Sequence, residues 1–222
     1  MNATDSSFVR PNEHVDSDHP DVISWATAHG LGDSPRAIAV SLYYATRDGF
    51  RYSPWNVRFS RDDLRASLTL LRGPKEGAHC IDKALLLAAA ARVHGIPSRL
   101  HFANVRNHVG TARLEQELGT DILVFHGYCE LHLAGRWVAA TPAFNRELCE
   151  RVGVTPLEFD GLSDSIFQAW DQQAGKFMEY VEDHGTHASI PYEAMMAQWK
   201  VHYPHIVERG AWPKPGDALY EE

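Results

Sequence analysis

The chain has 222 residues, of which 44% are hydrophobic and 23% charged, a composition that indicates one folded domain and excludes extensive disorder. Its formal net charge of −8 argues against nucleic acid or an anionic membrane surface as the main partner. No apolar run is long enough to cross a bilayer, and residues 1–7 lack the basic region and the apolar core of a signal peptide. Three cysteines give no even disulfide framework, which is typical of a reducing compartment, so we expect a cytoplasmic protein.

The first clear element is a helix that begins at Pro35 with Ser34 as its N-cap, since both residue types favour these positions. Residues 1–33 are expected to pack on the core. The segment that follows the helix, residues 50–55, is predicted to be extended and contains Tyr52 and Trp55. These aromatic rings could line an acyl site or donate a hydrogen bond toward an oxyanion. The simpler interpretation, which we favour, places both rings in the core or at its rim.

Cys80 stands where a glycine-containing loop changes into a helix that is apolar on nearly every face, and such a helix is expected to be buried. A thiolate at a helix start faces unpaired N–H groups and the positive end of the helix dipole, which lower its pKa. Asp82 acts in the opposite direction, so a cationic partner for the thiol must come from elsewhere in the chain. Taken alone, Cys80 is more simply an inert buried cysteine.

Residues 125–142 predict a β-hairpin, because two β-rich runs flank a short connection over residues 134–136 that contains a glycine. His126 lies near the start of the first strand. With a period of two, Tyr128 and Glu130 share its face, and Cys129 takes the opposite, core-facing side. A zinc site built from His126, Cys129 and His132 is disfavoured, because residues 126 and 129 point to opposite faces and no second close pair completes four ligands. We therefore expect no metal and no cofactor.

Together these two segments resemble the transglutaminase-like family, a branch of the papain-like cysteine enzymes. In that family a Gly-x-Cys-x-Asp helix start precedes a Gly-Ile-Pro-x-Arg exit. The chain carries the first motif over residues 77–82, with one extra residue before the cysteine, and the second over residues 95–99. The family's histidine strand continues with an aromatic residue, a Glu, a Gly-x-Trp turn and an Asp-Pro pair. The matching residues are, in order, His126, Tyr128, Glu130, Gly135, Trp137 and Pro142.

The resemblance extends over residues 35–145 and implies an α+β fold, a papain-like transglutaminase-like core in which the nucleophile helix packs on an antiparallel sheet. We place this core at residues 34–150 and a helical C-terminal extension, part of the same domain, at residues 151–222. Helical spacing predicts one helix from Asp164 through Val181 and another over residues 191–203, which ends before Pro204.

The resemblance also implies a mechanism in which Cys80 attacks a carbonyl carbon while His126 holds it as a thiolate–imidazolium pair and later protonates the leaving amine. Thr141 stands where the family has its aspartate. A threonine hydroxyl can fix the imidazole by a hydrogen bond but supplies no charge. Asn145 is an alternative orienting residue, since papain-like enzymes often use a neutral asparagine. Tyr52, Trp55, Tyr128 and Glu130 complete the supporting candidates.

Two functions remain open at this point. The first is thiol-dependent hydrolysis, or acyl transfer, of a peptide, protein or small amide through an acyl-thioester on Cys80, with hydrolysis as the default because water is abundant. The second is a catalytically silent protein- or peptide-binding module on the same fold, which the replacement of the aspartate by Thr141 favours. The sequence leaves the substrate and the oligomeric state undecided.

Overall fold

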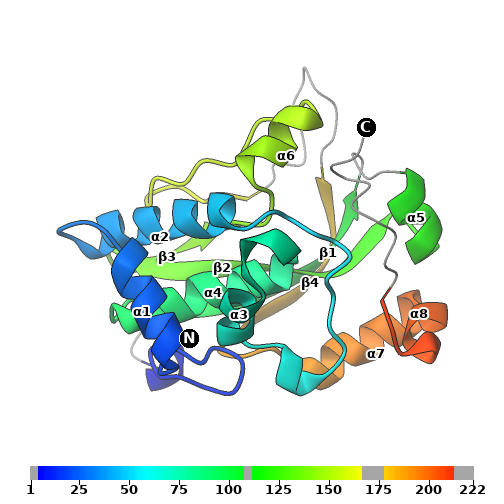
Figure 1. The fold of residues 1–222 in the computed structure, drawn as a ribbon, viewed down its shortest axis with the longest axis horizontal. Coiled ribbons are helices and arrows are strands. Elements are labelled where there is room, and N and C mark those ends of the chain that lie inside the picture. The colour runs from blue at the N-terminus through cyan, green and yellow to red at the C-terminus, as the bar shows by residue number, and fades with distance from the viewer. Residues whose placement is uncertain (1–4, 108–111, 167–177, 213–222) are drawn as a thin grey trace.

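The computed structural model describes residues 5–107, 112–166 and 178–212 (Figure 1). Within these ranges two short 3-10 helices cover Ser6–Phe8 and Arg61–Asp63. The α-helices are α1 (Pro20–His29), α2 (Pro35–Gly49), α3 (Ala66–Glu76), α4 (Cys80–Val93), α5 (Ala112–Leu118), α6 (Arg146–Arg151), α7 (Tyr192–His202) and α8 (Pro204–Arg209). The strands are β1 (Ser98–Asn107), β2 (Ile122–Leu133), β3 (Arg136–Ala140) and β4 (Met178–His187).

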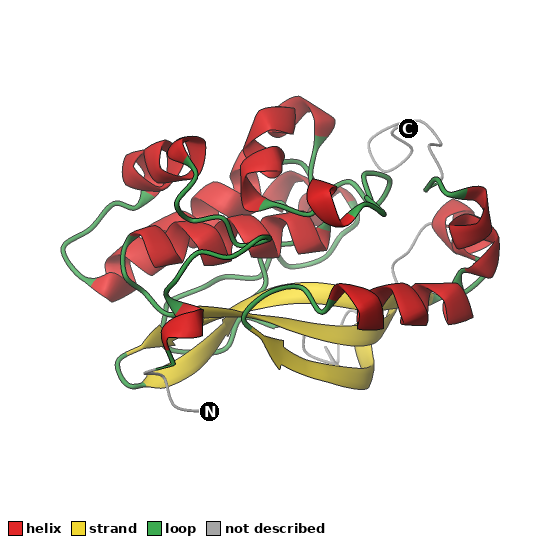
Figure 2. Cartoon of the chain, turned by 90° about the horizontal axis from the view of Figure 1, so that it is seen from below, coloured by secondary structure: helices red, strands yellow, loops and turns green. Residues whose placement is uncertain are grey.

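The four strands form one antiparallel sheet in the order β3-β2-β1-β4, and most of the helices lie on one face of it (Figure 2). The predicted hairpin is confirmed as β2 and β3. Its turn consists of Ala134 and Gly135, whose φ angles are 49° and 85°. Positive φ at both central residues matches the twist of the flanking strands, which is why a two-residue connection suffices.

Helix α4 is the centre of the fold and is buried from Cys80 through Arg92, as its apolar sequence predicts. It packs on β1 and β2 on one side and on α1, α2 and α3 on the others. Gly127 lets β2 approach the first turn of α4 closely, because a Cβ at that position would lie 3.2 Å from Ile81 Cγ1. The nucleophile helix therefore lies directly on the antiparallel sheet, which confirms the α+β architecture expected from the sequence.

The predicted start of α2 is also confirmed, since Ser34 Oγ accepts a hydrogen bond of 3.2 Å from the backbone N–H of Ala37 and Pro35 occupies the first helical position. At the C-terminal side, α7 confirms the helix expected over residues 191–203. Pro204 ends that helix and begins α8, where a missing N–H costs nothing.

The helix predicted from Asp164 through Val181 is wrong at both of its described ends. Residues 164–166 are not helical, with Ser165 in a β-bridge to Ala140, and Met178–His187 form strand β4. Residues 167–177 of that prediction lie outside the described residues. Met178 and Tyr180 are two positions apart and pack with Ala103 and Val105 of β1. The spacing of Met178 and Val181 is typical of a helix, whereas that of Met178 and Tyr180 is typical of a strand, and pairing with β1 decides for the strand. The region after residue 150 is therefore a mixture of strand and helices.

No helix in the described parts of the chain combines the length and the hydropathy that a transmembrane segment needs.

Candidate active site

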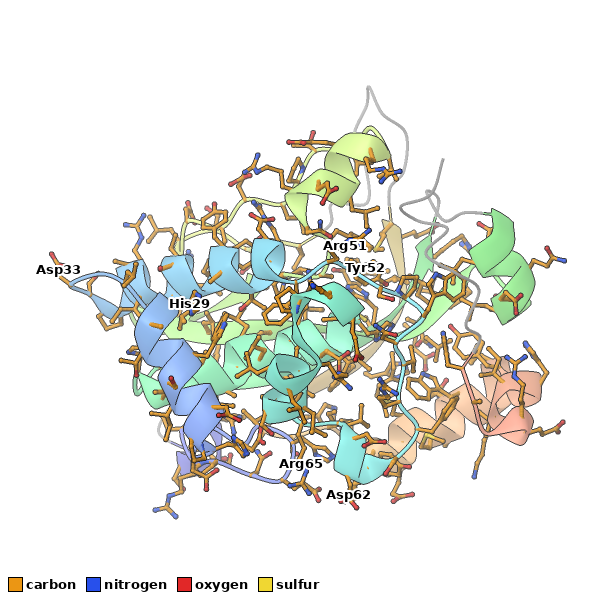
Figure 3. The ribbon with its side chains drawn as sticks, viewed as in Figure 1. His29, Asp33, Arg51, Tyr52, Asp62 and Arg65 are labelled. Atoms are coloured by element: carbon orange, nitrogen blue, oxygen red, sulfur yellow. The ribbon has the colours of Figure 1, made fainter. Side chains whose placement is uncertain are left out.

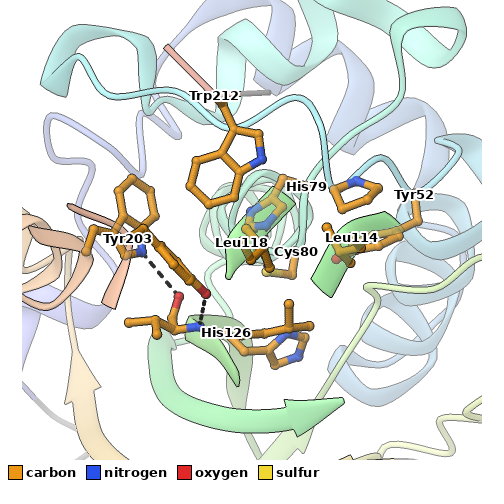
Figure 4. A pocket seen from close by; sticks show the side chains of 12 residues that line it. Tyr52, His79, Cys80, Leu114, Leu118, His126, Tyr203 and Trp212 are labelled. Carbon is orange, nitrogen blue, oxygen red and sulfur yellow. Dashed lines mark hydrogen bonds between the residues drawn. The ribbon is translucent and has the colours of Figure 1, made fainter. Parts of the chain in front are cut away.

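Cys80 is the first residue of α4 and lines a cavity with residues from several distant parts of the chain. Figure 4 shows this cavity, with His79 and Cys80 at the start of α4 and His126 on β2. The described lining residues are Tyr52, Pro54, His79, Cys80, Leu114, Leu118, Leu123, Val124, His126, Trp199, Tyr203 and Trp212. None of them is an acid, a lysine or an arginine, so the walls around the thiol are apolar apart from the two imidazoles and the tyrosine hydroxyls.

Hydrogen bonds to the preceding loop hold the start of α4 in place. Ala78 donates its N–H to Arg51 O over 2.8 Å, and the N–H of Ser53 donates back to Ala78 O over 3.0 Å. Gly77, at φ 75°, is required at this approach because a Cβ there would lie 2.8 Å from Arg51 O. Tyr52 follows Arg51 on the loop that leaves α2, so its ring is brought close to the N-terminal end of α4 (Figure 3).

Asp82 secures the same loop from within the first turn of the helix. Its Oδ2 accepts the backbone N–H of His79 over 3.0 Å, and its Oδ1 accepts a hydrogen bond of 2.7 Å from Arg72 of α3. Burial raises the pKa of the Asp82 carboxyl, and Arg72 opposes that shift. Asp82 also raises the pKa of the Cys80 thiol, in the direction that the sequence predicts.

The thiol of Cys80 contacts the ring of its neighbour His79, with 3.5 Å from Sγ to Nδ1 and 3.7 Å from Sγ to Nε2. Burial raises the pKa of Cys80 to about 12, although the backbone N–H groups of Gly127 and Ile81 act to lower it. Burial likewise lowers the pKa of His79 to about 4. The resting thiol and its neighbouring imidazole are therefore both uncharged at neutral pH.

His126 lies on β2, is 1% exposed and lines the same cavity as Cys80. Burial, with a contribution from His79, lowers the pKa of its imidazole to about 3. Burial therefore disfavours both members of the expected thiolate–imidazolium pair. The physical reason is that both groups are removed from water, which penalises the charged form of each.

The backbone that leads into His126 is held by Trp199 of α7 and by Tyr203, which directly follows α7. Tyr203 Oη accepts the N–H of Val124 over 2.8 Å and donates to Ile122 O over 2.7 Å. The indole N–H of Trp199 donates to Val124 O over 3.2 Å. These bonds engage β2 at the residues that precede Phe125, whose φ of 60° interrupts the regular strand. The C-terminal helices thus help to set the path of the chain into His126.

Thr141 follows β3 and is 1% exposed. Its Oγ1 has no hydrogen-bond partner among the described residues, so the bond expected between Thr141 and His126 is not formed in this conformation. Asn145, the alternative, caps α6 and accepts the N–H of Tyr52 through Oδ1 over 2.9 Å. It connects the region after the hairpin to the loop that carries Tyr52.

The remaining supporting candidates, Trp55, Tyr128 and Glu130, lie outside the described wall of the cavity. Trp55 is a core residue, 5% exposed, which agrees with the simpler interpretation of that ring. Tyr128 stacks on His101 with ring centroids 4.6 Å apart. Glu130 binds Arg99 over 2.7 Å and His101 over 2.6 Å. Among the described residues the cavity wall includes none of Trp55, Tyr128 and Glu130.

Most of the cavity wall is not predicted from the sequence, including its polar or aromatic residues His79, Trp199, Tyr203 and Trp212. His79 carried a signal, since it is adjacent to Cys80 at a helix start. The other three lie far along the chain, and helical spacing alone does not show which part of the core a helix packs on. In the described part of the chain no group of three or more His, Cys, Asp or Glu side chains is arranged to hold a metal ion.

The fold and the site together define a papain-like α+β core, with a cysteine at the start of a buried helix and a histidine on the adjoining sheet. Residues 25–142, more than half of the chain, match the transglutaminase-like superfamily. The chain belongs to this superfamily.

The family assignment is accompanied by one similar solved structure, that of a putative cysteine protease from Cytophaga hutchinsonii. It shares 16% sequence identity with this chain at a TM-score of 0.47. The alignment covers 64% of this chain and 43% of that protein, so the chain spans less than half the length of the protein it matches. The comparison with curated proteins gave no match.

Proposed function

We propose that the protein is a thiol-dependent acyl hydrolase or acyltransferase that acts on a peptide, protein or small amide. Cys80 is the nucleophile, and His126 serves first as base and then as acid. The observation that supports this proposal most is that Cys80 and His126, which belong to two separate motifs of the family, line one cavity at the start of α4.

In the proposed reaction Cys80 Sγ attacks the carbonyl carbon as its proton passes to His126. Because both groups are neutral in the resting site, the proton moves during the attack instead of beforehand. The oxyanion that forms is received by the Cys80 backbone N–H at the helix start and by a second donor. Collapse breaks the carbon–nitrogen bond, and the imidazolium gives its proton to the leaving amine. Water, or an acceptor amine, then cleaves the thioester.

A catalytically silent binding module is the second candidate, and two observations favour it. Thr141 replaces the family's aspartate, and its hydroxyl makes no hydrogen bond to any described residue. The thiol is also protonated and 2% exposed in this conformation. On this interpretation the apolar cavity would receive a peptide side chain without reacting with it.

The deciding experiment uses p-nitrophenyl acetate, a small activated ester, and follows acetylation of Cys80 by mass spectrometry together with nitrophenol release. We expect acetyl-Cys80 to form and turn over in the wild type. His126→Ala should lower the rate by about a hundredfold or more, the usual contribution of a general base. Cys149→Ala is the matched control, because Cys149 is also a buried thiol of raised pKa but does not line the cavity.

Two results would reject the enzymatic proposal. One is acetylation of Cys80 no faster than that of Cys149, and the other is a Cys80 rate that is indifferent to His126. Either would favour the binding module.

A further inference from the structure

Strand β2 is irregular directly before His126. At this point β1 contributes one residue, Asn104, where β2 contributes two, Val124 and Phe125, so the pairing contains a β-bulge. Phe125 has a φ of 60°. A phenylalanine rarely adopts a positive φ, because its Cβ then crowds the backbone, so the neighbouring contacts must impose this conformation.

The side chain of Asn104 provides the main contact with the bulge. It is 2% exposed, and its Oδ1 accepts the N–H of Phe125 over 2.9 Å. The same oxygen lies 2.9 Å from His184 Nε2, which therefore donates to it, since a carbonyl oxygen only accepts. The Nδ2 of Asn104 donates to Glu182 over 2.9 Å. The amide is thus fixed at both its oxygen and its nitrogen.

The ring of Phe125 is held by the same group of residues. It stacks on the imidazole of His184, with centroids 4.3 Å apart and an interplanar angle of 17°. It also lies against Phe102 of β1, with centroids 5.4 Å apart. His184 therefore holds the ring of Phe125 and, through its bond to Asn104, the amide that holds the backbone of Phe125.

The two N–H groups of the bulge both go to side chains. Asn104 accepts that of Phe125, and Tyr203 Oη accepts that of Val124 over 2.8 Å (Figure 4). A regular strand in this place would bond to backbone carbonyl groups and would need no buried amide. Burying an amide that must then be satisfied is costly, so the fold alone gives no reason to prefer it. The bulge does have a local consequence, because it changes the path of the strand at the residue before His126.

We propose that Asn104 is a positioning residue for His126, which holds the bulge at Phe125 closed and so keeps the imidazole directed into the cavity that contains Cys80. The catalytic part of this inference rests on the proposed function, because the position of His126 affects a reaction only if Cys80 is the nucleophile. The position of the imidazole itself can be measured without any reaction.

The test uses one variant that removes the acceptor and one that restores it. Asn104→Leu keeps a side chain of similar size but cannot accept the N–H of Phe125. The double variant Asn104→Asp/Glu182→Gln keeps an acceptor for that N–H and lets residue 182 donate to the new carboxylate. If Asn104→Leu does not fold, Asn104→Ser replaces it, since the hydroxyl lies one bond closer to the backbone and does not reach Phe125.

Ser98→Ala is the matched control. Ser98 is likewise a buried polar residue of β1, and its Oγ donates to Ala88 O over 2.8 Å. It pairs with Leu131, at the opposite end of the strand from the bulge. Thermal unfolding of each variant shows whether the fold is intact, and we expect Ser98→Ala to lower the melting temperature without displacing His126.

Two measurements follow the imidazole and its chemistry. The first is the NMR resonance of the His126 imidazole in protein labelled with ¹³C-histidine, assigned by its disappearance in His126→Ala. The second is acetylation of Cys80 by p-nitrophenyl acetate. We expect Asn104→Leu to displace the resonance and to slow acetylation by about tenfold or more, because small misplacements of reacting groups are costly. The double variant should restore both, and Ser98→Ala should change neither.

The outcomes separate this inference from the proposed function. An undisplaced resonance in the folded Asn104 variant, or unchanged acetylation beside slowed acetylation in His126→Ala, would overturn the role of Asn104 and leave the proposed function standing. A double variant that restores neither measurement, or an equal displacement in Ser98→Ala, would also overturn it. A displaced and restored resonance in a protein whose wild-type Cys80 is not acetylated would support the positioning by Asn104 and reject the proposed function.

Discussion

Gly127 is a position of close approach between β2 and the start of α4, and we expect Gly127→Ala to disturb both the stability of the fold and the reactivity of Cys80. The added Cβ would lie 3.1 Å from Phe102 Cε1, 3.2 Å from Ile81 Cγ1 and 3.4 Å from Ile81 Cα. Carbon atoms pack optimally at about 3.5–4.0 Å. The contact with Ile81 Cα is already an ordinary one, but the two shorter contacts are with side chains that are themselves buried in the core. Because these side chains have little room to rotate, we expect β2 and α4 to separate by a few tenths of an ångström.

The expected cost follows from two opposing contributions. Overpacking a core position costs about 1–3 kcal/mol, whereas replacing glycine by alanine inside a strand returns about 0.5–1 kcal/mol. We therefore expect a net loss of roughly 1–2 kcal/mol in the free energy of unfolding. Gly127 directly follows His126, and Ile81 directly follows Cys80. The same separation should move the imidazole away from the thiol and slow acetylation of Cys80 by about tenfold, since small misplacements of reacting groups are costly.

Urea denaturation measures the first effect, and the p-nitrophenyl acetate assay measures the second. Gly49→Ala is the matched control. Gly49 lies at the end of α2, and a Cβ there meets nothing within 4 Å, so the Gly49→Ala variant should be as stable as the wild type or more stable. The reasoning is refuted if Gly127→Ala and Gly49→Ala unfold at the same urea concentration, or if Gly127→Ala acetylates at the wild-type rate.

Three further substitutions test the surroundings of the site. Asp82→Asn should destabilise the fold by about 3 kcal/mol, because it leaves Arg72, whose side chain is 10% exposed, without its charge partner. The same variant should lower the pH midpoint of Cys80 alkylation by iodoacetamide, because it removes the negative charge that raises the pKa of the thiol. His101→Gln should flatten the pH dependence of the melting temperature above about pH 6.5. Burial alone would lower the pKa of His101, but its two carboxylate partners raise it. The stabilisation that His101 contributes is therefore complete below its pKa in the unfolded state and is lost as the pH rises through its higher pKa in the folded state. A wild-type melting temperature that stays constant over this pH range would contradict the prediction. Tyr203→Phe should lower the free energy of unfolding in urea by about 1–3 kcal/mol, because it leaves the buried N–H of Val124 without its acceptor, and it should slow acetylation of Cys80. Unchanged acetylation would show that Tyr203 does not help to position His126.

The parts of the fold that the sequence predicts correctly are those with strong local signals. Helix α4 is apolar on every face over a single run, and the β2–β3 turn contains a glycine between two β-rich segments. Strand β4 is wrongly predicted as a helix because the apolar residues Met178, Tyr180 and Val181 contain both the three-residue spacing of a helix and the two-residue spacing of a strand. The strand forms because these residues pair with β1, which is far away in the sequence.

The candidate site, too, can be predicted from the sequence only in part. Cys80 and His126 were predicted from two motifs that resemble those of the family, and the structure places both in the wall of one cavity. The protonation of that pair could not be predicted, because it depends on how completely the cavity is closed to water. Closure is provided by side chains such as Trp199 and Tyr203, whose position near the thiol is a result of tertiary packing.

The family match ends at residue 142, yet the cavity does not end there. Trp199, Tyr203 and Trp212 form part of its wall, and two of them bond to the backbone that leads into His126. A histidine on a strand can serve a thiol only if the strand holds it at a fixed distance, and here the strand is irregular at Phe125. At this point Asn104 Oδ1 of β1 accepts the N–H of Phe125 over 2.9 Å, and Trp199 of α7 and Tyr203, which follows α7, bond to the backbone of Val124. The segment after residue 190 is therefore part of the structure that forms the candidate site, because it supplies part of the cavity wall and holds the backbone that leads into His126.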